Sequence, residues 1–481
     1  MKKVFVFCIG GTGIRVMKSI TMLMAGGMDT NGYVVVPIIL DPHLDLEEKK
    51  NLHSLIAEYQ EIYRRSINNG NQTLNPLSGF FGSDIRTIDD LNNQTNDTQE
   101  TAGSKEKFRS YIELANLGTT DINNFLVETL FSTKNLNNPL SVGFKGNPNV
   151  GTVVLGEMIE GAEWFKSFKQ HCEKDDRVFI ISSIFGGTGA SGYPLLEKKI
   201  RLSENEPAVK NALMGAVTVL PYYGLKDPAT TGSDIDSANF YTKTKAALAY
   251  YHGTVKADYL YYVGETSLKQ VYENDEKKQD DKANFIELVA ASALFDFLKR
   301  GEPTRQQFLS RAIDDDKESL DLVSMGAGYK ELIKSVADFM LLRLLVEELP
   351  EESFFPLSKN RGFNSSFYGD SAFQSLLRFC NGYYNWYLEL AQNKRAFAPI
   401  NFDNPKKMSG WIKTIELDAK DDSYYLLEMT KVSNKNKSKD HENKFRFVSN
   451  KNKSKDHENK FRFFLQFAYD AIDKYTKKIY K

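Results

Sequence analysis

Two glycine-rich turns are the features of this sequence best suited to chemistry. The first is GGTG at 10–13, after the apolar run at 4–9, and the second is GGTGASG at 186–192, after the apolar run at 177–183. A glycine turn between a buried strand and a helix offers backbone N–H groups and the positive helix end to an anion. We therefore predict phosphate binding at both turns, with tight packing of a helix on a strand as the alternative. The candidate residues are Gly10, Gly11, Thr12 and Gly13 in the first turn, and Gly186, Gly187, Thr188, Gly189, Ala190, Ser191 and Gly192 in the second.

The two turns depart from two widespread phosphate-binding motifs, the Walker loop and the dinucleotide fingerprint. The second turn lacks the lysine that G-x-x-x-x-G-K-[ST] requires. The first turn reads G-x-G-x-x-V from Gly11, with Val16 where the dinucleotide fingerprint has glycine or alanine. Asp41 nevertheless lies about where that fingerprint places its ribose-binding acid. An NAD-dependent oxidoreductase therefore stays open as the weaker alternative, although the sequence has no convincing catalytic His or Tyr.

The elements that would position these turns alternate between strands and helices. Apolar runs typical of strands covered on both faces alternate with helical patterns, which favours an α/β fold with a parallel sheet. The helix at 284–300 is apolar nearly all the way round and is therefore expected in the interior. The expected strands are 4–9, 33–40, 177–183, 213–220 and 258–263, and the expected helices are 14–26, 152–171, 194 onward, 237–251, 284–300, 330–348, 371–392 and 464–480.

The motifs and their order resemble the tubulin and FtsZ-like GTPases, most of all the divergent bacterial tubulin-like proteins. The family signature is G-G-G-T-G-[ST]-G after a buried strand, and VFIISSIFGGTGASGYP matches it except for Phe185 at the first glycine and Ala190-Ser191 within the loop. CIGGTGIRV at 8–16 resembles the first nucleotide loop of the family, and GFKGNPNVG at 143–151 resembles the third loop of FtsZ. AVTVLPYY at 216–223 is similar to the strand and loop after the signature. The resemblance covers roughly residues 1–330, and neither 66–105 nor the region after 350 matches FtsZ.

The resemblance implies GTP or GDP bound together with Mg²⁺. Gly146 and Asn147 of the third loop would then join the phosphate site. Asn239 and Asn284 sit where the family places its two guanine-reading side chains, and Asp41 would contact ribose or a magnesium-bound water. An ordinary structural role is open to each of these three residues as well. Asn284 opens a pattern close to a capping box, Asn239 is a polar residue near a helix start, and Asp41 ends a strand before a turn.

The resemblance also implies hydrolysis at a site shared between subunits. In the family, a loop after the central helix with the pattern N-x-D-x-x-[ED] enters the next subunit's site, where its carboxylates position water for attack on the γ-phosphate. This chain lacks that pattern and offers IDDDKESLDL, in which Asp315, Glu318 and Asp321 are suitably spaced. A solvated charged loop is the alternative. We therefore expect an assembly-dependent GTPase that associates head to tail into filaments. The other class left open is a non-polymerising nucleotide switch or scaffold in a larger defence or membrane-associated assembly.

The sequence divides into three predicted parts. These are a tubulin-like GTP-binding domain at 1–283 with a surface insertion at 66–105, a connecting helix at 284–300, and a second α+β or helical domain at 301–481. In the last part, residues 432–447 recur identically at 448–463. Each copy has four Lys and one Arg against one Asp and one Glu, so the two carry +6 in a chain of net charge −1, which leaves −7 elsewhere. We expect the repeat to be a solvated basic loop or a lengthened hairpin.

Charge and composition exclude several classes. An acidic main body is a poor binder of duplex DNA, so no specific nucleic acid is expected. Cys8, Cys172 and Cys380 have no paired spacing, so neither a disulfide scaffold nor a zinc site is expected. No apolar run reaches the roughly 18 residues that a membrane span needs. The three cysteines fit a reducing cytoplasm. The resemblance implies a bacterial protein that associates with itself, and further protein partners are expected at its C-terminal region.

Overall fold

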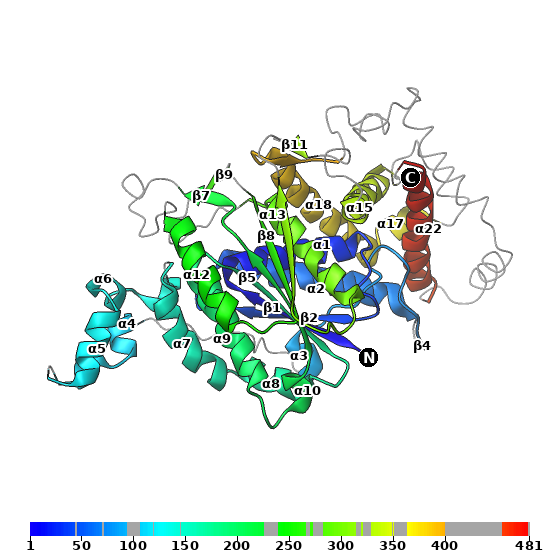
Figure 1. Ribbon diagram of the computed structural model, residues 1–481. Helices are drawn as coiled ribbons and strands as arrows, with labels where there is room; N and C mark the ends of the chain where they lie inside the picture. The colour runs from blue at the N-terminus through cyan, green and yellow to red at the C-terminus, as the bar shows by residue number, and fades with distance from the viewer. Residues whose placement is uncertain are drawn as a thin grey trace.

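A parallel sheet of six strands forms the centre of the computed structural model (Figure 1). Its strands lie in the order β10-β8-β6-β5-β1-β2, and every neighbouring pair is parallel. Strands β1 and β2 are buried almost throughout because helices cover the sheet. The predicted α/β class with a parallel sheet is confirmed. The six strands are β1 (Lys3–Ile9), β2 (Val34–Leu40), β5 (Arg177–Ser183), β6 (Leu213–Val219), β8 (Tyr259–Glu265) and β10 (Gln307–Ile313).

The structure describes most of the chain, with gaps. The described residues are 1–43, 46–69, 72–93, 106–118, 120–144, 146–225, 239–265, 270–272, 282–313, 319–320, 329–348, 350, 363–399 and 455–479. Within these ranges, no helix is long and apolar enough to cross a membrane.

Helices pack on both faces of the sheet. Helices α1 (Gly10–Ala25) and α13 (Phe285–Lys299) lie against each other on one face, with α2 (Glu47–Ile67) beside α1 (Figure 1). Helices α7 (Pro148–Gly161), α9 (Gly187–Arg201) and α12 (Phe240–Thr254) lie on the other face. Helix α13 contacts β6, β8 and α1 and is buried on nearly every side, as its all-round apolarity predicts.

The strand order reverses between β1 and β5. The chain passes from β1 outward to β2 on one side, and later from β5 to β6 on the other side. Helix α1 starts directly at the carboxyl end of β1, and α9 starts beyond the carboxyl end of β5. In open α/β sheets this switch point is where ligands bind, because the two connections diverge and leave a crevice between them.

The helices that follow the two glycine turns start earlier than the sequence predicted. The prediction placed the helices from 14 and from 194, whereas α1 begins at Gly10 and α9 at Gly187. Glycine has a low helix propensity, so a pattern-based reading delays the start of a helix that begins with several glycines. Tertiary contacts override that propensity here. The glycine turns are therefore the first turns of the two helices, where backbone N–H groups have no partner within the helix.

The helix predicted at 152–171 is two helices. Helix α7 ends at Gly161, and α8 (Glu163–His171) begins after Ala162, which has extended dihedral angles.

Part of the predicted surface insertion at 66–105 also differs from expectation. Phe80 and Phe81 are fully buried, and Ile85 forms a parallel bridge with Val35 of β2. Their apolar side chains pack under the C-terminal helices, and Phe80 and Phe81 both contact Phe339 there.

Three C-terminal helices cover α1 and α2. Helices α15 (Lys330–Glu348) and α18 (Ser371–Gln392) pack against each other, and α22 (Lys455–Ile479) packs against α15 and α2. Strand β10, which follows the predicted connecting helix, joins the central sheet through β8. The domain boundaries at 283, 300 and 301 stay a prediction.

The second repeat copy is partly helical rather than a loop. Helix α22 begins at Lys455, so the last nine residues of that copy lie in it. Phe461 and Phe464 are buried at helical spacing, and apolar residues three or four apart form one face of a helix. The expectation of a solvated loop or hairpin is therefore wrong for 455–463. The earlier part of the repeat lies outside the described residues.

Candidate phosphate-binding site

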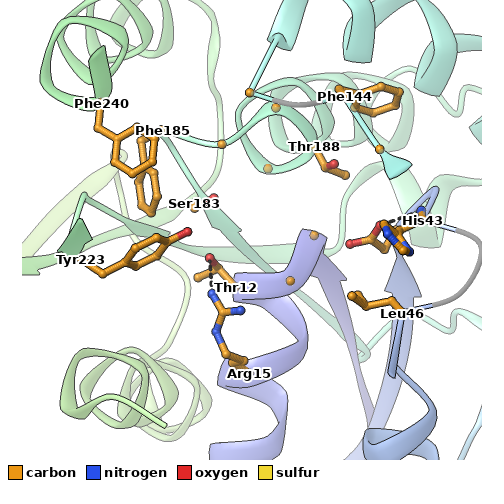
Figure 2. Close-up of a pocket in the computed structure, with 18 of the residues that line it drawn as sticks. Thr12, Arg15, His43, Leu46, Phe144, Ser183, Phe185, Thr188, Tyr223 and Phe240 are labelled. Carbon is orange, nitrogen blue, oxygen red and sulfur yellow. Dashed lines mark hydrogen bonds between the residues drawn. The ribbon is translucent and has the colours of Figure 1, made fainter. Parts of the chain in front are cut away.

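A pocket opens where β1 and β5 end, at the switch point of the sheet (Figure 2). Its cavity volume is about 140 Å³, and it is open to solvent. Its lining residues are Gly10, Gly11, Thr12, Arg15, Asp41, His43, Leu46, Gly143, Phe144, Gly146, Ser183, Phe185, Gly186, Gly187, Thr188, Gly189, Tyr223, Leu225 and Phe240.

The two glycine turns lie against each other at the base of this pocket. Gly10 has a φ of 71°, a left-handed conformation that favours glycine. A Cβ atom on Gly10 would lie 3.5 Å from Cβ of Thr188 and 3.7 Å from the amide nitrogen of Gly189. The turns therefore bring the N-termini of a 16-residue and a 15-residue helix to one place. Two helix dipoles and two sets of N–H groups without helical partners favour an anion there.

The predicted third loop joins the two turns. Phe144 and Gly146 line the pocket, and Gly146 has a φ of 72°. A Cβ atom on Gly187 would lie 3.1 Å from the amide nitrogens of both Gly146 and Asn147. Only a glycine at 187 allows this close approach without displacing the loop backbone. Three segments far apart in the sequence thus converge on one pocket.

The predicted phosphate-site residues divide into two groups. Those that line the pocket are Gly10, Gly11, Thr12, Asp41, Gly146, Gly186, Gly187, Thr188 and Gly189, and those that do not are Gly13, Asn147, Ala190, Ser191, Gly192, Asn239 and Asn284. Packing explains two glycines of the second group. A Cβ atom on Gly13 would lie 2.6 Å from the carbonyl carbon of Cys8, and one on Gly192 would lie 2.8 Å from Cγ2 of Ile9.

The two predicted guanine-reading residues lie elsewhere. Asn284 is buried and caps α13, since its Oδ1 accepts from the N–H of Ile286 at 2.9 Å and its own N–H donates to Glu287 Oε2 at 3.0 Å. Asn239 is exposed at the N-cap position of α12, next to the pocket-lining Phe240. The capping box expected for Asn284 is therefore present, and a guanine contact by either residue stays a prediction.

Asp41 is the buried carboxylate of the pocket wall. It is 5% exposed, and its Oδ1 accepts from the N–H of His43 at 2.8 Å. Burial raises the pKa of Asp41, while that hydrogen bond and the positive charges of Lys49 and Arg15 act in the opposite direction. A divalent cation bound beside Asp41 would favour its ionised form further.

Arg15 is a pocket residue that sequence reasoning missed. Its Nε donates to Glu287 Oε1 at 2.8 Å, and its Nη1 donates to Glu48 Oε1 at 3.3 Å. Its Nη2 donates to the hydroxyl oxygens of Tyr222 at 3.1 Å and Thr12 at 3.4 Å. Tyr222 in turn donates to Glu287 Oε1 at 2.6 Å. This buried network ties the first glycine turn to the N-terminus of α13. Burial raises the pKa of Glu287, and the Arg15 guanidinium counters that rise.

Aromatic side chains form one wall of the pocket. Phe185, Tyr223 and Phe240 are drawn together on one side of the turns in Figure 2. Their ring centroids are 4.8 Å apart for Phe185 and Phe240, 5.5 Å for Phe185 and Tyr223, and 6.0 Å for Tyr223 and Phe240. Phe185 stands at the position where the family signature has its first glycine. Such a wall offers apolar, polarisable faces on which a flat heteroaromatic ring can stack.

The predicted hydrolytic acids Asp315, Glu318 and Asp321 lie outside the described residues. Among the residues that the structure does describe, no group of three or more His, Cys, Asp or Glu side chains is arranged to hold a metal ion. Asp41 is thus the carboxylate that the described pocket offers to a cation.

Fold and pocket together define the class. This is a doubly wound parallel α/β protein with a pocket lined by glycine turns at its switch point. No protein-family model matches the chain, and no curated protein matches it. Among solved structures, CetZ from Methanosaeta thermophila strain DSM 6194 aligns at 14% identity and a TM-score of 0.23, over 55% of this chain and 46% of that chain. The chain thus spans less than half of the length of that protein.

Proposed function

We propose that this pocket binds a guanine nucleoside di- or triphosphate. The convergence of two glycine-rich helix N-termini at the switch point carries the proposal. Each turn alone could be explained by close packing of a helix on a strand. Two of them facing one cavity, with a third glycine loop at its side, form a concave surface of backbone that suits several linked phosphates.

The nucleobase would stack on the aromatic wall. Phe185, Tyr223 and Phe240 flank the turns at a distance from Phe144 and His43, which are drawn on the other side of the pocket in Figure 2. A nucleotide would then extend from that wall across the glycine turns. The preference for guanine rests on the order of the family motifs in the sequence.

Magnesium fits this arrangement. Mg²⁺ in nucleotide sites keeps most of its water, with one or two protein ligands and phosphate oxygens completing an octahedron. The carboxylate of Asp41 and the hydroxyl of Thr188 line the pocket and are suited to bind the ion directly or through its water. When bound, the ion would offset the negative charge of the phosphates.

Hydrolysis would require a neighbouring copy of the chain. Water would attack the γ-phosphorus as the bond to the bridging β,γ-oxygen breaks, giving GDP and inorganic phosphate. Asp315, Glu318 or Asp321 of the next subunit would orient that water and receive its proton. Because such a contact is heterologous, it repeats along one direction and forms filaments. A nucleotide switch that does not polymerise is the competing function.

Ligand identity is tested by what the purified protein binds. We expect GTP or GDP to be released on denaturation, and GTP with Mg²⁺ to raise the melting temperature more than ATP and far more than NAD. At a hundredfold excess over Kd, mass action adds about 2.7 kcal/mol to the free energy of unfolding. Absence of a shift with saturating guanine nucleotide would refute the proposal, and an equal shift with ATP would refute the guanine preference alone.

Self-association is tested separately by ultracentrifugation. The proposal expects the protein to pellet with GTP and to stay in the supernatant with GDP. Protein that binds GTP but never pellets would favour the switch.

A further inference from the structure

Helix α5 (Ile122–Leu130) exposes an unusual number of apolar side chains. None of its nine residues is buried. Four large apolar side chains of this helix are strongly exposed, namely Ile122 (67%), Phe125 (65%), Leu126 (47%) and Leu130 (67%). A single exposed apolar residue is ordinary on a protein surface. Four of them on one short helix form a patch, and such patches are typical of interaction sites.

These four side chains form one stripe that faces away from the rest of the protein. Their spacing of three or four residues places them on one side of the helix. On the other side, Val127 packs against the core, and Asn124 Nδ2 donates to the carbonyl oxygen of Gly118 at 3.3 Å. A surface helix usually turns its apolar side to the core. Helix α5 has the opposite arrangement, so its apolar stripe does not serve the folding of its own chain.

The segment that carries α5 is itself folded. The N–H of Phe108 donates to the carbonyl oxygen of Asn138 at 2.9 Å and closes its base. The rings of Phe108 and Phe131 pack edge to face inside it, with centroids 4.9 Å apart. Figure 1 shows this arm (cyan) projecting beside α7, on the side away from the C-terminal helices. The arm comprises residues 106–118 and 120–142 and includes α4 (Phe108–Tyr111), α5 and α6 (Thr133–Leu136).

The stripe has the symmetry of a surface that pairs with itself. Ile122 lies four residues before Leu126, and Leu130 lies four residues after it. Residues four apart form a ridge on a helix, and two such ridges pack into each other's grooves. When two α5 helices meet in opposite directions, Leu126 meets Leu126 of the partner subunit, and Ile122 lies toward Leu130 of the partner subunit. The same stripe then serves both sides of the contact, as a two-fold axis requires.

The area and the charges of the stripe also fit a second copy of this chain. A specific interface needs roughly 1,000 Å² in total. The four side chains offer about 400–500 Å² in each copy, so two stripes come close to that area and predict a weak, reversible dimer. No charged residue lies within the stripe, so pairing buries no charge. The charged residues of α5 and its N-cap are Glu128 and Asp121, whereas helices that lie on membranes are rich in Lys and Arg.

We propose that α5 forms a two-fold contact between two copies of this chain, in which the apolar stripes pack antiparallel with Leu126 at the axis. This contact is isologous and closes after two copies. It is therefore distinct from the proposed head-to-tail contact, and it does not depend on nucleotide binding. Where both contacts form, α5 joins two filaments side by side.

The first test measures the mass of the nucleotide-free protein by sedimentation equilibrium over a range of concentrations. The parent should show a monomer–dimer equilibrium. Leu126→Gln should weaken the dimer by about tenfold, because it places two uncompensated amides in an apolar contact. Leu202→Gln is the matched control, since Leu202 is 60% exposed at the C-cap of α9, outside the arm. It should dimerise as the parent does.

The second test examines the symmetry of the contact with single cysteines. The three native cysteines are buried. Diamide, a thiol oxidant, should convert the two thiols of paired Leu126→Cys chains into one disulfide, because residue 126 meets its own copy within the short Cβ separation that a disulfide requires. Ile122→Cys should not link to its own copy, because antiparallel helices place the two at opposite ends of the contact. Leu202→Cys should stay monomeric.

Each alternative result overturns the inference. A parent that stays monomeric at every concentration, or a dimer that Leu126→Gln does not weaken, means that the stripe does not pair with itself. Binding of a monomeric parent to phospholipid vesicles would assign the stripe to a membrane instead. Self-linking of Ile122→Cys with none at Leu126→Cys would exclude the antiparallel two-fold arrangement. Because neither test contains nucleotide, failure here leaves the proposed nucleotide binding standing.

Discussion

Gly186 and Gly189 of the second turn have different structural roles although they are close in the sequence. A Cβ atom on Gly189 would lie 2.5 Å from the carbonyl oxygen and 2.8 Å from the amide nitrogen of Ser183. A Cβ atom on Gly186 would meet only the Ser183 hydroxyl oxygen, at 3.0 Å, and Gly186 has extended dihedral angles that alanine adopts freely. Gly189 thus serves the packing of α9 on β5, whereas Gly186 shapes the pocket surface.

This difference predicts that alanine at Gly189 and alanine at Gly186 affect different properties of the protein. Gly189→Ala should lower the free energy of unfolding by about 1–3 kcal/mol, because backbone has to shift to admit the methyl group. Gly186→Ala should leave that free energy within about 1 kcal/mol and weaken nucleotide binding instead. Urea unfolding and calorimetric titration of both variants measure the two quantities. Similar stability losses in both variants would contradict the assignment.

Arg15 gives the second prediction at this scale. Arg15→Met leaves Glu287 buried without its cation, which should cost about 3–5 kcal/mol of folding free energy near pH 7.5. The pKa of Glu287 is already raised by burial, and loss of the guanidinium raises it further. A carboxyl with a raised folded-state pKa holds its proton more tightly when folded, so its destabilising effect fades as the pH falls toward its ordinary value of 4.5.

The loss in Arg15→Met should therefore be smaller near pH 5.5 than near pH 7.5. Unfolding by urea at both pH values measures it. Lys18→Met is the control, since Lys18 pairs with Glu389 at 3.7 Å on a partly exposed surface. It should cost no more than about 1 kcal/mol at either pH.

A site residue could be predicted from the sequence only where the residues that explain its role lie close to it in the chain. The glycine turns follow apolar runs directly, so their role can be read from adjacent residues. Arg15 could not be recognised in this way, because its partner Glu287 lies 272 positions away. The aromatic wall likewise combines Phe185 with residues from two later segments. Asn284 shows the opposite case, since its capping pattern is local and was predictable.

At the scale of elements, the alternation of strands and helices was predictable, while several boundaries were not. Helices α1 and α9 begin at glycines because packing on β1 and β5 outweighs intrinsic propensity. Strand β10 was not expected, since its sequence, QFLSRAI, lacks a continuous apolar run. It is an edge strand, which needs less burial than the strands within the sheet.

The contact between α22 and α15 includes a buried carboxyl group, Asp338, whose charge depends on pH. Asp338 of α15 is buried, with Lys334 as its hydrogen-bonding partner, and Lys334 also contacts Asp473 of α22 at 2.9 Å. Burial raises the pKa of Asp338 from 3.8 to about 6, against the lowering effect of Lys334. Because the pKa is raised by folding, ionisation of Asp338 destabilises the fold as the pH rises through about 6.

This gives a prediction for Asp338→Asn. Relative to the variant, the parent should gain on the order of 1–3 kcal/mol of folding free energy between pH 7.5 and pH 4.5. Urea unfolding of both proteins at several pH values yields the difference. A difference that does not change with pH would mean that Asp338 keeps an ordinary pKa in the folded protein.

At the scale of the whole molecule, the pocket belongs to one chain, whereas the acids proposed for hydrolysis would come from another. The predicted acids lie outside the described residues, and the family resemblance assigns them to a neighbouring subunit. One chain would then supply the pocket and the next would supply the carboxylates. Two defective chains that lack different halves of such a site should therefore complement each other.

Mixing two variants tests this shared site. Gly186→Leu should obstruct the pocket, and the triple change Asp315→Asn, Glu318→Gln and Asp321→Asn should spare nucleotide binding while removing the acids. Each variant alone should hydrolyse GTP slowly. In an equal mixture, a pocket from the acid-deficient chain meets acids from the pocket-deficient chain in about a quarter of random head-to-tail contacts. The rate of GTP hydrolysis should recover to about that fraction of the parent rate. It should also rise more steeply than in proportion to total protein concentration, because two chains form each active site. If mixing restores nothing while the parent turns over GTP in proportion to its concentration at every dilution, the chemistry lies within one chain, and filaments are not needed for hydrolysis.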